Sequence, residues 1–165
     1  MFDIFGEFNT VSELNTTARG LLEEGDLEGL KKLAEENGIS MYDVEDYVSG
    51  IASPLVPSPE MAALGKIQVE REEMKPDEIM NDWVNYIEMQ CNEDKVMAIC
   101  VRKKGKNIRD CIAHILNWSF NHQKEIDEDI KKKAGVNSGR VTMGIPGMAT
   151  AKKLIREYYV GEKAS

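Results

Sequence analysis

Apolar side chains recur along this chain mostly at spacings of three and four residues, the pattern of helices that bury one face. No segment alternates apolar and polar positions over a useful length, so no strand is predicted beyond a short extended piece at 141–143. The pattern therefore predicts an all-α bundle of about seven or eight helices. These helices are expected over residues 10–25, 26–38, 40–51, 58–73, 76–89, 92–105, 107–120 and 149–159.

Short polar residues at helix starts and glycines at helix ends set these boundaries. Thr10 with Glu13 has the spacing of a capping box, and Ser58 followed by Pro59 places a cap residue before a proline in the first turn. Gly25 follows the first helix, and Gly38, after Asn37, is expected to stop the second helix in a left-handed conformation. Further helices are expected to begin at Asp26, Ser40, Asp77, Asn92 and Asn107.

The segment 53–59 interrupts the helical pattern, because its three prolines cannot continue a helix. We expect acidic helical hairpins over residues 1–52 and a helical domain with a basic C-terminal part over residues 58–165. The sequence leaves open whether they pack as one domain or as two sub-bundles. A glycine-rich loop over 135–147 is expected before the last helix.

Charge is divided unevenly along the chain. The 165 residues carry 29 acidic side chains and 21 Lys and Arg side chains, a net charge of −8. Residues 1–80 hold 18 acidic and 6 basic residues, a balance of −12, whereas residues 81–165 hold 11 and 15, a balance of +4. The total argues against a simple DNA-binding protein, which needs positive charge to bind phosphates. The division predicts two surfaces of opposite sign.

Residues 33–44 have the spacing of a helix-turn-helix motif, with Gly38 in the turn. The helix that follows carries no Lys or Arg, so phosphates would repel it and a plain helical hairpin is the simpler interpretation. An acidic helix can also occupy a basic nucleic-acid channel by imitating phosphates. On that hypothesis the acidic contact surface consists of Asp43, Glu45, Asp46, Glu70, Glu72 and Glu73.

Several clusters of basic residues lie in the C-terminal half. They are either solvated helix ends or a face that binds phosphates or an acidic partner. Few aromatic residues lie among them, so sequence-specific base stacking is not supported. The candidate contacts to nucleic acid or an acidic partner are Arg102, Lys103, Lys104, Lys106, Arg109, Lys131, Lys132, Lys133, Arg140, Lys152 and Lys153.

Candidate chemistry is sparse. Arg109 and His114 match the short R-x4-H pattern of the all-α HEPN ribonucleases, in which His would act as acid or base and Arg would bind the phosphate. The same two residues also fit an ordinary solvent-facing pair on one helix. The three cysteines and two histidines lack the short paired spacings of a zinc site. We therefore expect no catalytic residue, no metal and no cofactor.

The chain also lacks the marks of a secreted or membrane protein. No apolar run reaches the roughly 20 residues that span a bilayer, and the N-terminus has neither the basic nor the apolar region of a signal peptide. Three cysteines cannot all pair within one chain. A cytoplasmic protein that does not contact a membrane is expected.

Two stretches resemble known proteins. The segments Met1–Phe8 and Pro59–Lys66 are similar to a group of small phage and conjugative-element proteins of Firmicutes. Gly105–Ile108, followed by Cys111 and by Ile115-Leu116, resembles the PcfK-like family. Some proteins of these two groups are anti-CRISPR inhibitors of type II CRISPR nucleases. After its paired tyrosines, however, the chain lacks the acidic stretch that ends PcfK-like proteins.

The resemblance implies a non-enzymatic inhibitor in the cytoplasm of a bacterial host cell, with a type II CRISPR nuclease as its partner, either free or loaded with guide RNA. The acidic half would dock on the positive channel of the nuclease, and the basic half would face DNA, guide RNA or a second copy in a homodimer. Two alternatives stay open. One is a DNA-binding accessory or regulatory protein of a mobile element, and the other is a HEPN-like ribonuclease.

Overall fold

The protein is an all-α bundle, as the hydrophobic pattern predicts. A computed structural model describes residues 2–161, which hold nine helices and one two-stranded sheet. The helices are α1 (Val11–Glu24), α2 (Leu27–Glu36), α3 (Met41–Val48), α4 (Pro59–Met74), α5 (Glu78–Glu93), α6 (Lys95–Arg102), α7 (Ile108–Asn121), α8 (Glu128–Lys133) and α9 (Met148–Val160). The strands are β1 (Lys124–Glu125) and β2 (Thr142–Met143).

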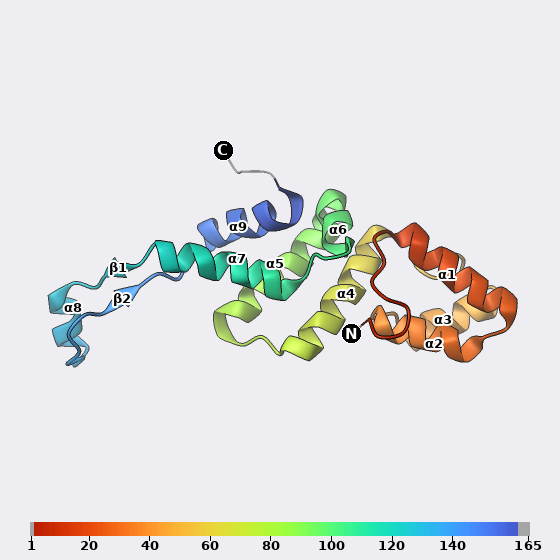
Figure 1. Cartoon of the computed structure of the whole chain (residues 1–165), viewed down its shortest axis with the longest axis horizontal. Coiled ribbons are helices and arrows are strands. Elements are labelled where there is room, and N and C mark those ends of the chain that lie inside the picture. Colours follow the sequence, from red (N-terminus) through yellow and green to blue (C-terminus); the bar gives the residue numbers. More distant parts are fainter. Residues whose placement is uncertain (1, 162–165) are drawn as a thin grey trace.

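The molecule is elongated, with three parts along its long axis (Figure 1). Helices α1–α3 lie at one end, and α4–α7 with α9 form the middle. The sheet and α8 project from the far end of α7 as an arm. Helix α4 contacts α5, α6 and α7, and its N-terminal end reaches the α1–α3 group, so it links two parts of the molecule.

Most helix starts lie where the short polar residues indicate. The side chains of Thr10, Ser58 and Asn107 each accept a hydrogen bond from the backbone N–H three residues ahead. The predicted start of the sixth helix at Asn92 is wrong. Helix α5 continues to Glu93, and Asp94 caps α6 by accepting from the N–H groups of Val96 and Met97. The Asp94 carboxylate binds two backbone N–H groups that have no partner within the helix. Asn and Asp are both favoured at N-caps, so the sequence alone did not distinguish Asn92 from Asp94.

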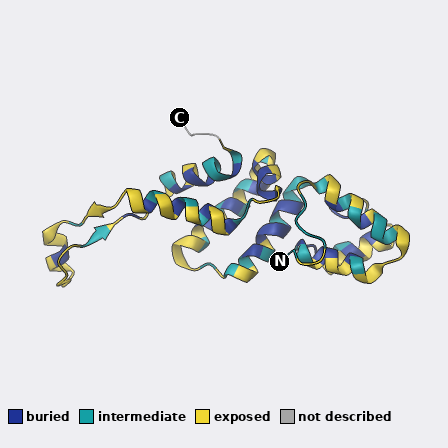
Figure 2. Ribbon diagram, viewed as in Figure 1, coloured by how far each residue is buried: buried dark blue, intermediate teal, exposed yellow. Residues whose placement is uncertain are grey.

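Buried apolar residues form two cores, and α4 contributes to both. The first core joins α1–α3 to Leu55, Val56 and Ala62. The second begins at Ala63 and joins α4–α7 to α9. Figure 2 shows buried residues on the inward sides of the helices in both groups. Packing therefore passes from one core to the other within α4, and the proline-rich segment belongs to the first core.

The turn between α2 and α3 presses directly on α4. Gly38 and Gly65 meet so closely that a Cβ on Gly38 would overlap the backbone of Gly65, and a Cβ on Gly65 would overlap the carbonyl oxygen of Asn37. Asn15 of α1 fixes the proline-rich segment from the other side: its side-chain NH₂ group donates to the carbonyl of Val56 at 2.8 Å, and its side-chain oxygen accepts from the Val56 N–H at 3.0 Å.

The region before α9 is more ordered than a glycine-rich loop. Lys124 pairs with Met143 and Glu125 with Thr142 in an antiparallel sheet, and the six-residue helix α8 lies between the two strands. Sequence analysis missed β1 and α8. We call residues 122–147 the arm. Figure 2 shows the arm largely exposed, and in the described chain none of its residues belongs to either hydrophobic core.

Candidate interaction surfaces

One side of α3 is an exposed, acidic helical face. Glu45 and Asp46 lie three and four residues after Tyr42 and four and three before Ser49, and all four are exposed. Val44 and Tyr47 face the first core. Tyr42 is 82% exposed. We call Tyr42, Glu45, Asp46 and Ser49 the α3 face. Glu45 and Asp46 were predicted from the sequence as contacts but Tyr42 was not, although the same helical spacing places it beside them.

Asp43 has a different role from its two acidic neighbours. It is half-buried, and its carboxylate accepts a hydrogen bond from the Ser40 hydroxyl at 2.6 Å. The Ser40 oxygen in turn accepts from the Asp43 N–H at 3.2 Å. The pair closes the N-terminus of α3, which makes Asp43 a capping residue at the edge of the α3 face.

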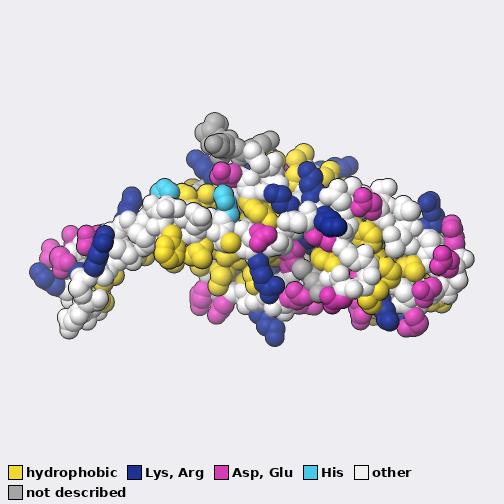
Figure 3. Space-filling model, viewed as in Figure 1, with side chains coloured by type: hydrophobic (Ala, Val, Ile, Leu, Met, Phe, Trp, Pro, Cys, Tyr) yellow, Lys and Arg dark blue, Asp and Glu magenta, His cyan; other side chains and the backbone are white. Residues whose placement is uncertain are grey.

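The α3 face lies in an acidic part of the molecule. Residues 1–52 contain 12 acidic and 3 basic residues, and most of these acids are exposed. On the face drawn in Figure 3, acidic side chains dominate the charged groups at the α1–α3 end. Since the surrounding charges share one sign, their potential adds and attracts a basic surface from a distance.

The three glutamates predicted on α4 do not form one surface with α3. The placement of Glu70 on an exposed acidic surface is wrong, because its side chain is 6% exposed and faces the interior. Glu72 is exposed and lines a shallow depression with Glu35 and Ser40, next to the start of α3. Glu73 lies toward α7, 3.8 Å from Arg109. Of the three, Glu72 alone extends the acidic surface around α3.

Two of the predicted basic contacts are buried, so those predictions are also wrong. Arg102 is 1% exposed, and its Nη2 donates to the side-chain oxygen of Asn37 at 2.9 Å. Lys131 is 6% exposed; its ammonium donates to the carbonyl of Gly139 at 2.7 Å and pairs with Glu128. Both cations are buried and held by intramolecular contacts. A count of charges along the sequence does not show this burial.

The other basic candidates are spread over the long axis of the molecule. Lys103 and Lys104 are exposed in the turn between α6 and α7, while Lys106 packs its ammonium over the Tyr158 ring. The remaining exposed residues belong to other elements: Arg109 to α7, Lys152 and Lys153 to α9, and Lys132, Lys133 and Arg140 to the arm. The structure does not bring these residues together into one basic face.

The two residues of the R-x4-H pattern face different carboxylates. Arg109 lies near Glu73 of α4, and the His114 Nε2 lies 3.8 Å from a carboxylate oxygen of Glu157 of α9. Both residues project from α7, but each is oriented by a separate neighbour. The carboxylates near the two residues therefore belong to different helices, α4 and α9.

The cysteines are inert in this fold. All three are buried, and burial raises the pKa of the Cys91 and Cys111 thiols to about 12, so both stay protonated at neutral pH. Within residues 2–161, no three His, Cys, Asp or Glu side chains gather closely enough to hold a metal ion. Nor does any helix of this part of the chain combine the length and apolarity of a membrane span.

A cluster of buried charges lies where the N-terminal segment, α4 and the α6–α7 turn meet. The Lys66 ammonium, 1% exposed as a residue, donates to Glu7 and to the carbonyls of Lys103 and Lys106. Glu70 accepts from the Ile108 N–H at 2.8 Å, at the start of α7. Sequence analysis did not identify this cluster.

Burial dominates the ionisation of Glu70. It raises the pKa of this carboxyl to about 7, against the lowering effects of the Ile108 N–H, Lys66 and Arg102. Lys66 is 3.9 Å from Glu70, and its three donors are already used by Glu7 and two carbonyls. A signal for this site exists in the sequence: Glu70 falls on the same helical stripe as the buried residues Ala63 and Ile67.

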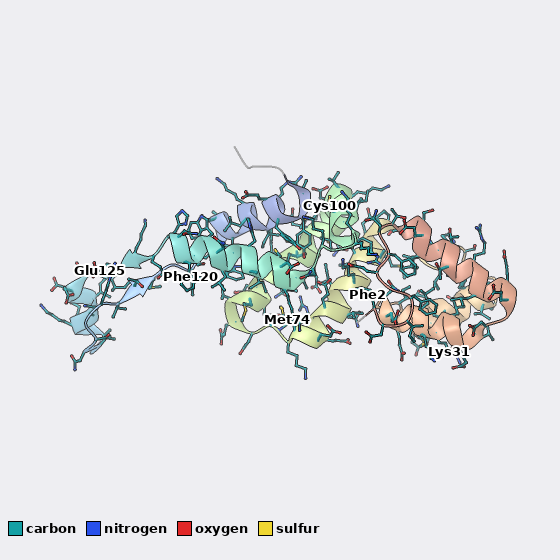
Figure 4. The ribbon with its side chains drawn as sticks, viewed as in Figure 1. Phe2, Lys31, Met74, Cys100, Phe120 and Glu125 are labelled. Atoms are coloured by element: carbon teal, nitrogen blue, oxygen red, sulfur yellow. The ribbon has the colours of Figure 1, made fainter. Side chains whose placement is uncertain are left out.

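A cavity of about 290 Å³ opens beside Glu70. Its walls come from the N-terminal segment, the C-terminal end of α4 and the first turn of α7. Figure 4 labels Phe2 and Met74, which enter it from the first two of these elements. We call this cavity the Glu70 pocket. It is lined by Phe2, Glu7, Glu70, Glu73, Met74, Asn107, Ile108, Arg109 and Asp110.

Compared with protein-family models, with curated proteins and with solved structures, the chain has no significant match in any of the three.

Proposed function

We propose that this protein inhibits a type II CRISPR nuclease by binding to it, without catalysing a reaction. The observation that carries the proposal is the α3 face, on which two exposed carboxylates lie one turn after an exposed tyrosine in an acidic part of the molecule. The nuclease class comes from the resemblance of residues 1–8 and 59–66 to small mobile-element proteins, some of which inhibit such enzymes. These nucleases hold nucleic acid in positively charged channels.

The physical basis is charge complementarity around an aromatic anchor. Carboxylates on a helix present negative charge toward basic side chains that would otherwise bind phosphates. Such charges chiefly accelerate association and select the partner. A tyrosine that the partner covers on binding supplies apolar contact area and a hydroxyl group at a low cost in conformational entropy. Glu45 and Asp46 should therefore govern the salt dependence of binding, and Tyr42 should govern the dissociation rate.

The test uses charge reversal on the α3 face. A Glu45→Lys/Asp46→Lys variant keeps Asp43, which closes the helix N-terminus, and should inhibit target cleavage at least about tenfold more weakly than the parent. The matched control is Glu78→Lys/Asp82→Lys, the same change in charge at exposed positions of α5. Tyr42→Ala should accelerate dissociation from the nuclease. Equal inhibition by the α3 variant and the α5 control would exclude the α3 face as the contact.

Binding is best measured by capture of a guide-loaded nuclease, with and without target DNA. Capture that target DNA abolishes would indicate competition for the DNA-binding channel. The alternatives give different results. A DNA-binding accessory protein would shift DNA in a salt-sensitive way and ignore the nuclease, with the shift lost when Lys103 and Lys104 become Ala. A HEPN-like ribonuclease would cleave RNA, and His114→Ala would abolish that cleavage.

A further inference from the structure

One wall of the Glu70 pocket holds a buried carboxylate oxygen that makes no hydrogen bond within the described residues. One carboxylate oxygen of Glu70 accepts from the Ile108 N–H, but the other, Oε1, lies 3.9 Å from the Lys66 ammonium and has no hydrogen-bond partner within residues 2–161. The side chain is 6% exposed and lines the cavity. A buried acceptor left without a donor destabilises the fold, and a ligand that supplies an N–H group would recover part of that cost.

The charges around the pocket favour a cation. Four carboxylates lie along it or in its wall: Glu7 from the N-terminal segment, Glu70 and Glu73 from α4, and Asp110 from α7. Three cations face them, namely Lys66 and Arg102 behind the wall and Arg109 at its lining. Among these seven described groups the balance is one negative charge above a pH of about 7, where Glu70 is ionised as well. One positive charge in the cavity would neutralise this balance.

The size and the walls of the pocket further limit the kinds of ligand that can bind in it. About 290 Å³ is at the lower limit of the cavities that take small molecules, and suits one long side chain. Phe2, Met74 and Ile108 offer apolar contacts, and the Phe2 ring already has the Arg102 guanidinium 5.8 Å from its centre. A guanidinium is weakly hydrated, stacks on aromatic rings and carries five donors in a planar fork, whereas an ammonium keeps its water more tightly.

We propose that the Glu70 pocket receives the guanidinium of an arginine side chain from a protein partner, with one N–H donating to Glu70 Oε1 and the apolar stem lying against Phe2 and Met74. The protein source rests on the proposed function, since the expected partner is a basic nuclease. The recognition of the guanidinium does not depend on it.

The first test therefore uses small probes and no nuclease. N-acetyl-arginine methylamide is titrated into the full chain while the backbone amides are followed by NMR. The matched probe is N-acetyl-citrulline methylamide, which has almost the same shape without the charge. The arginine probe should shift the Ile108 amide, whose N–H bonds Glu70, in a saturable way. The citrulline probe should bind at least about tenfold more weakly. Equal binding of both probes, or no shift at Ile108, would overturn the proposal.

Variants separate the pocket from the general acidity of α4. Glu70→Gln keeps an acceptor for the Ile108 N–H but removes the charge, and should weaken the arginine probe at least about tenfold. Glu72→Gln is the control, because Glu72 is exposed on the same helix and lies outside this pocket. Equal affinity of the arginine probe for the Glu70→Gln variant and for the parent would contradict the proposed guanidinium site. The parent's preference for the arginine probe over the citrulline probe tests the same site without any variant.

A third probe identifies the source of the guanidinium. Agmatine carries a guanidinium without a peptide backbone. If the pocket binds agmatine but not the capped arginine, its ligand is a free metabolite, and the proposal that the guanidinium comes from a protein is overturned. With a nuclease in hand, equal inhibition by the α3-face variant and its α5 control, with probe binding intact, would overturn the proposed α3 contact alone. Loss of probe selectivity with inhibition intact would overturn the pocket alone.

Discussion

Two glycines decide how closely the α2–α3 turn can approach α4. Gly38 has a φ of +64° and meets Gly65 backbone to backbone, so neither position has room for a Cβ. Because the obstacle is backbone rather than a flexible side chain, the strain of an added methyl group cannot be relieved by a rotamer change. The contact joins the two cores through main-chain atoms alone.

We predict that Gly65→Ala lowers the free energy of unfolding by about 2–3 kcal/mol, because the new methyl group would overlap the carbonyl oxygen of Asn37. The matched control is Gly20→Ala in α1, where a Cβ meets no atom within 4 Å and the helical backbone favours alanine. That control should gain up to about 1 kcal/mol. Urea denaturation of both variants measures the difference, and an equally stable Gly65→Ala variant would show that the two backbones can separate without cost.

Glu70 makes stability depend on pH in the direction opposite to an ordinary salt bridge. Burial raises the pKa of its carboxyl from 4.5 to about 7, so the folded state holds this proton more tightly than the unfolded state. The stabilisation is fully present below the unfolded pKa and is lost as pH rises from about 4.5 through 7. The groups that face this carboxyl are Lys66, Glu7 and Arg102.

The Glu70→Gln variant should therefore gain stability relative to the parent as pH rises. At pH 4 both side chains are neutral in the folded state and the two proteins should unfold at similar urea concentrations. At pH 8 the parent must keep a buried carboxylate, and the variant should be more stable by up to about 3 kcal/mol. Stability differences that stay constant between pH 4 and pH 8, or that favour the parent at pH 8, would mean that pairing with Lys66 outweighs burial.

At the scale of elements, the arm stands apart from the rest of the fold. It is held by a two-residue antiparallel pair and by local contacts such as the bond from the Ile126 N–H to the Val141 carbonyl at 2.9 Å. Its helix α8 is stabilised internally, by Asp127 at the N-cap and by the buried Lys131. Such an element adds little to the stability of the bundle that carries it.

We predict that the arm can be shortened without loss of the bundle. Replacing residues 126–141 by Asn-Gly joins the register pair Glu125 and Thr142 through a two-residue turn that suits a hairpin. The free energy of unfolding should change by less than about 1 kcal/mol, because the removed residues lie outside both described cores. Ile115→Ala in α7, a fully buried position, is the comparison and should cost about 2–5 kcal/mol. A shortened protein as unstable as that variant would show that the arm supports the bundle.

The elements that could be predicted from the sequence are those whose signals are local. Thr10, Ser58 and Asn107 bond the helix N-termini that they precede, so a few neighbouring residues suffice to find them. The β1–β2 pair could not be found in this way, since each strand has two residues and the partners are 17 or 19 positions apart. Helix α8 has six residues and no apolar stripe long enough to show helical periodicity.

The candidate site residues divide in the same way, into those with a local signal in the sequence and those whose burial depends on distant residues. Tyr42 was within reach, because it shares a helical spacing with Glu45 and Asp46. The burial of Arg102 was not, because it depends on Asn37, a residue 65 positions away. Charge along the sequence indicates a class of partner, but which charges are free for that partner is decided by tertiary contacts. Tertiary contacts bury one long basic side chain, such as Arg102, and leave another, such as Lys103, exposed to solvent.

At the scale of the whole molecule, the described residues form two cores, and several contacts join them. Helix α4 contributes Ala62 to one and Ala63 to the other, and the Gly38–Gly65 contact lies at their junction. Arg102 of α6 donates to Asn37 at the end of α2, which adds a buried hydrogen bond between the two halves. Separation of the halves would expose these groups together, so unfolding of one half should destabilise the other.

This coupling can be measured because both tryptophans report on one half. Trp83 belongs to the second core and Trp118 packs against it, whereas Leu30 is fully buried in the first. Leu30→Ala should lower the free energy of unfolding by about 2–5 kcal/mol and should shift the tryptophan-fluorescence midpoint in urea together with the far-UV circular dichroism midpoint. Leu27→Ala is the matched control on the same helix, since Leu27 is 43% exposed and should shift both midpoints little. A fluorescence midpoint that stays at the parental value while circular dichroism resolves an earlier transition would show two independent halves.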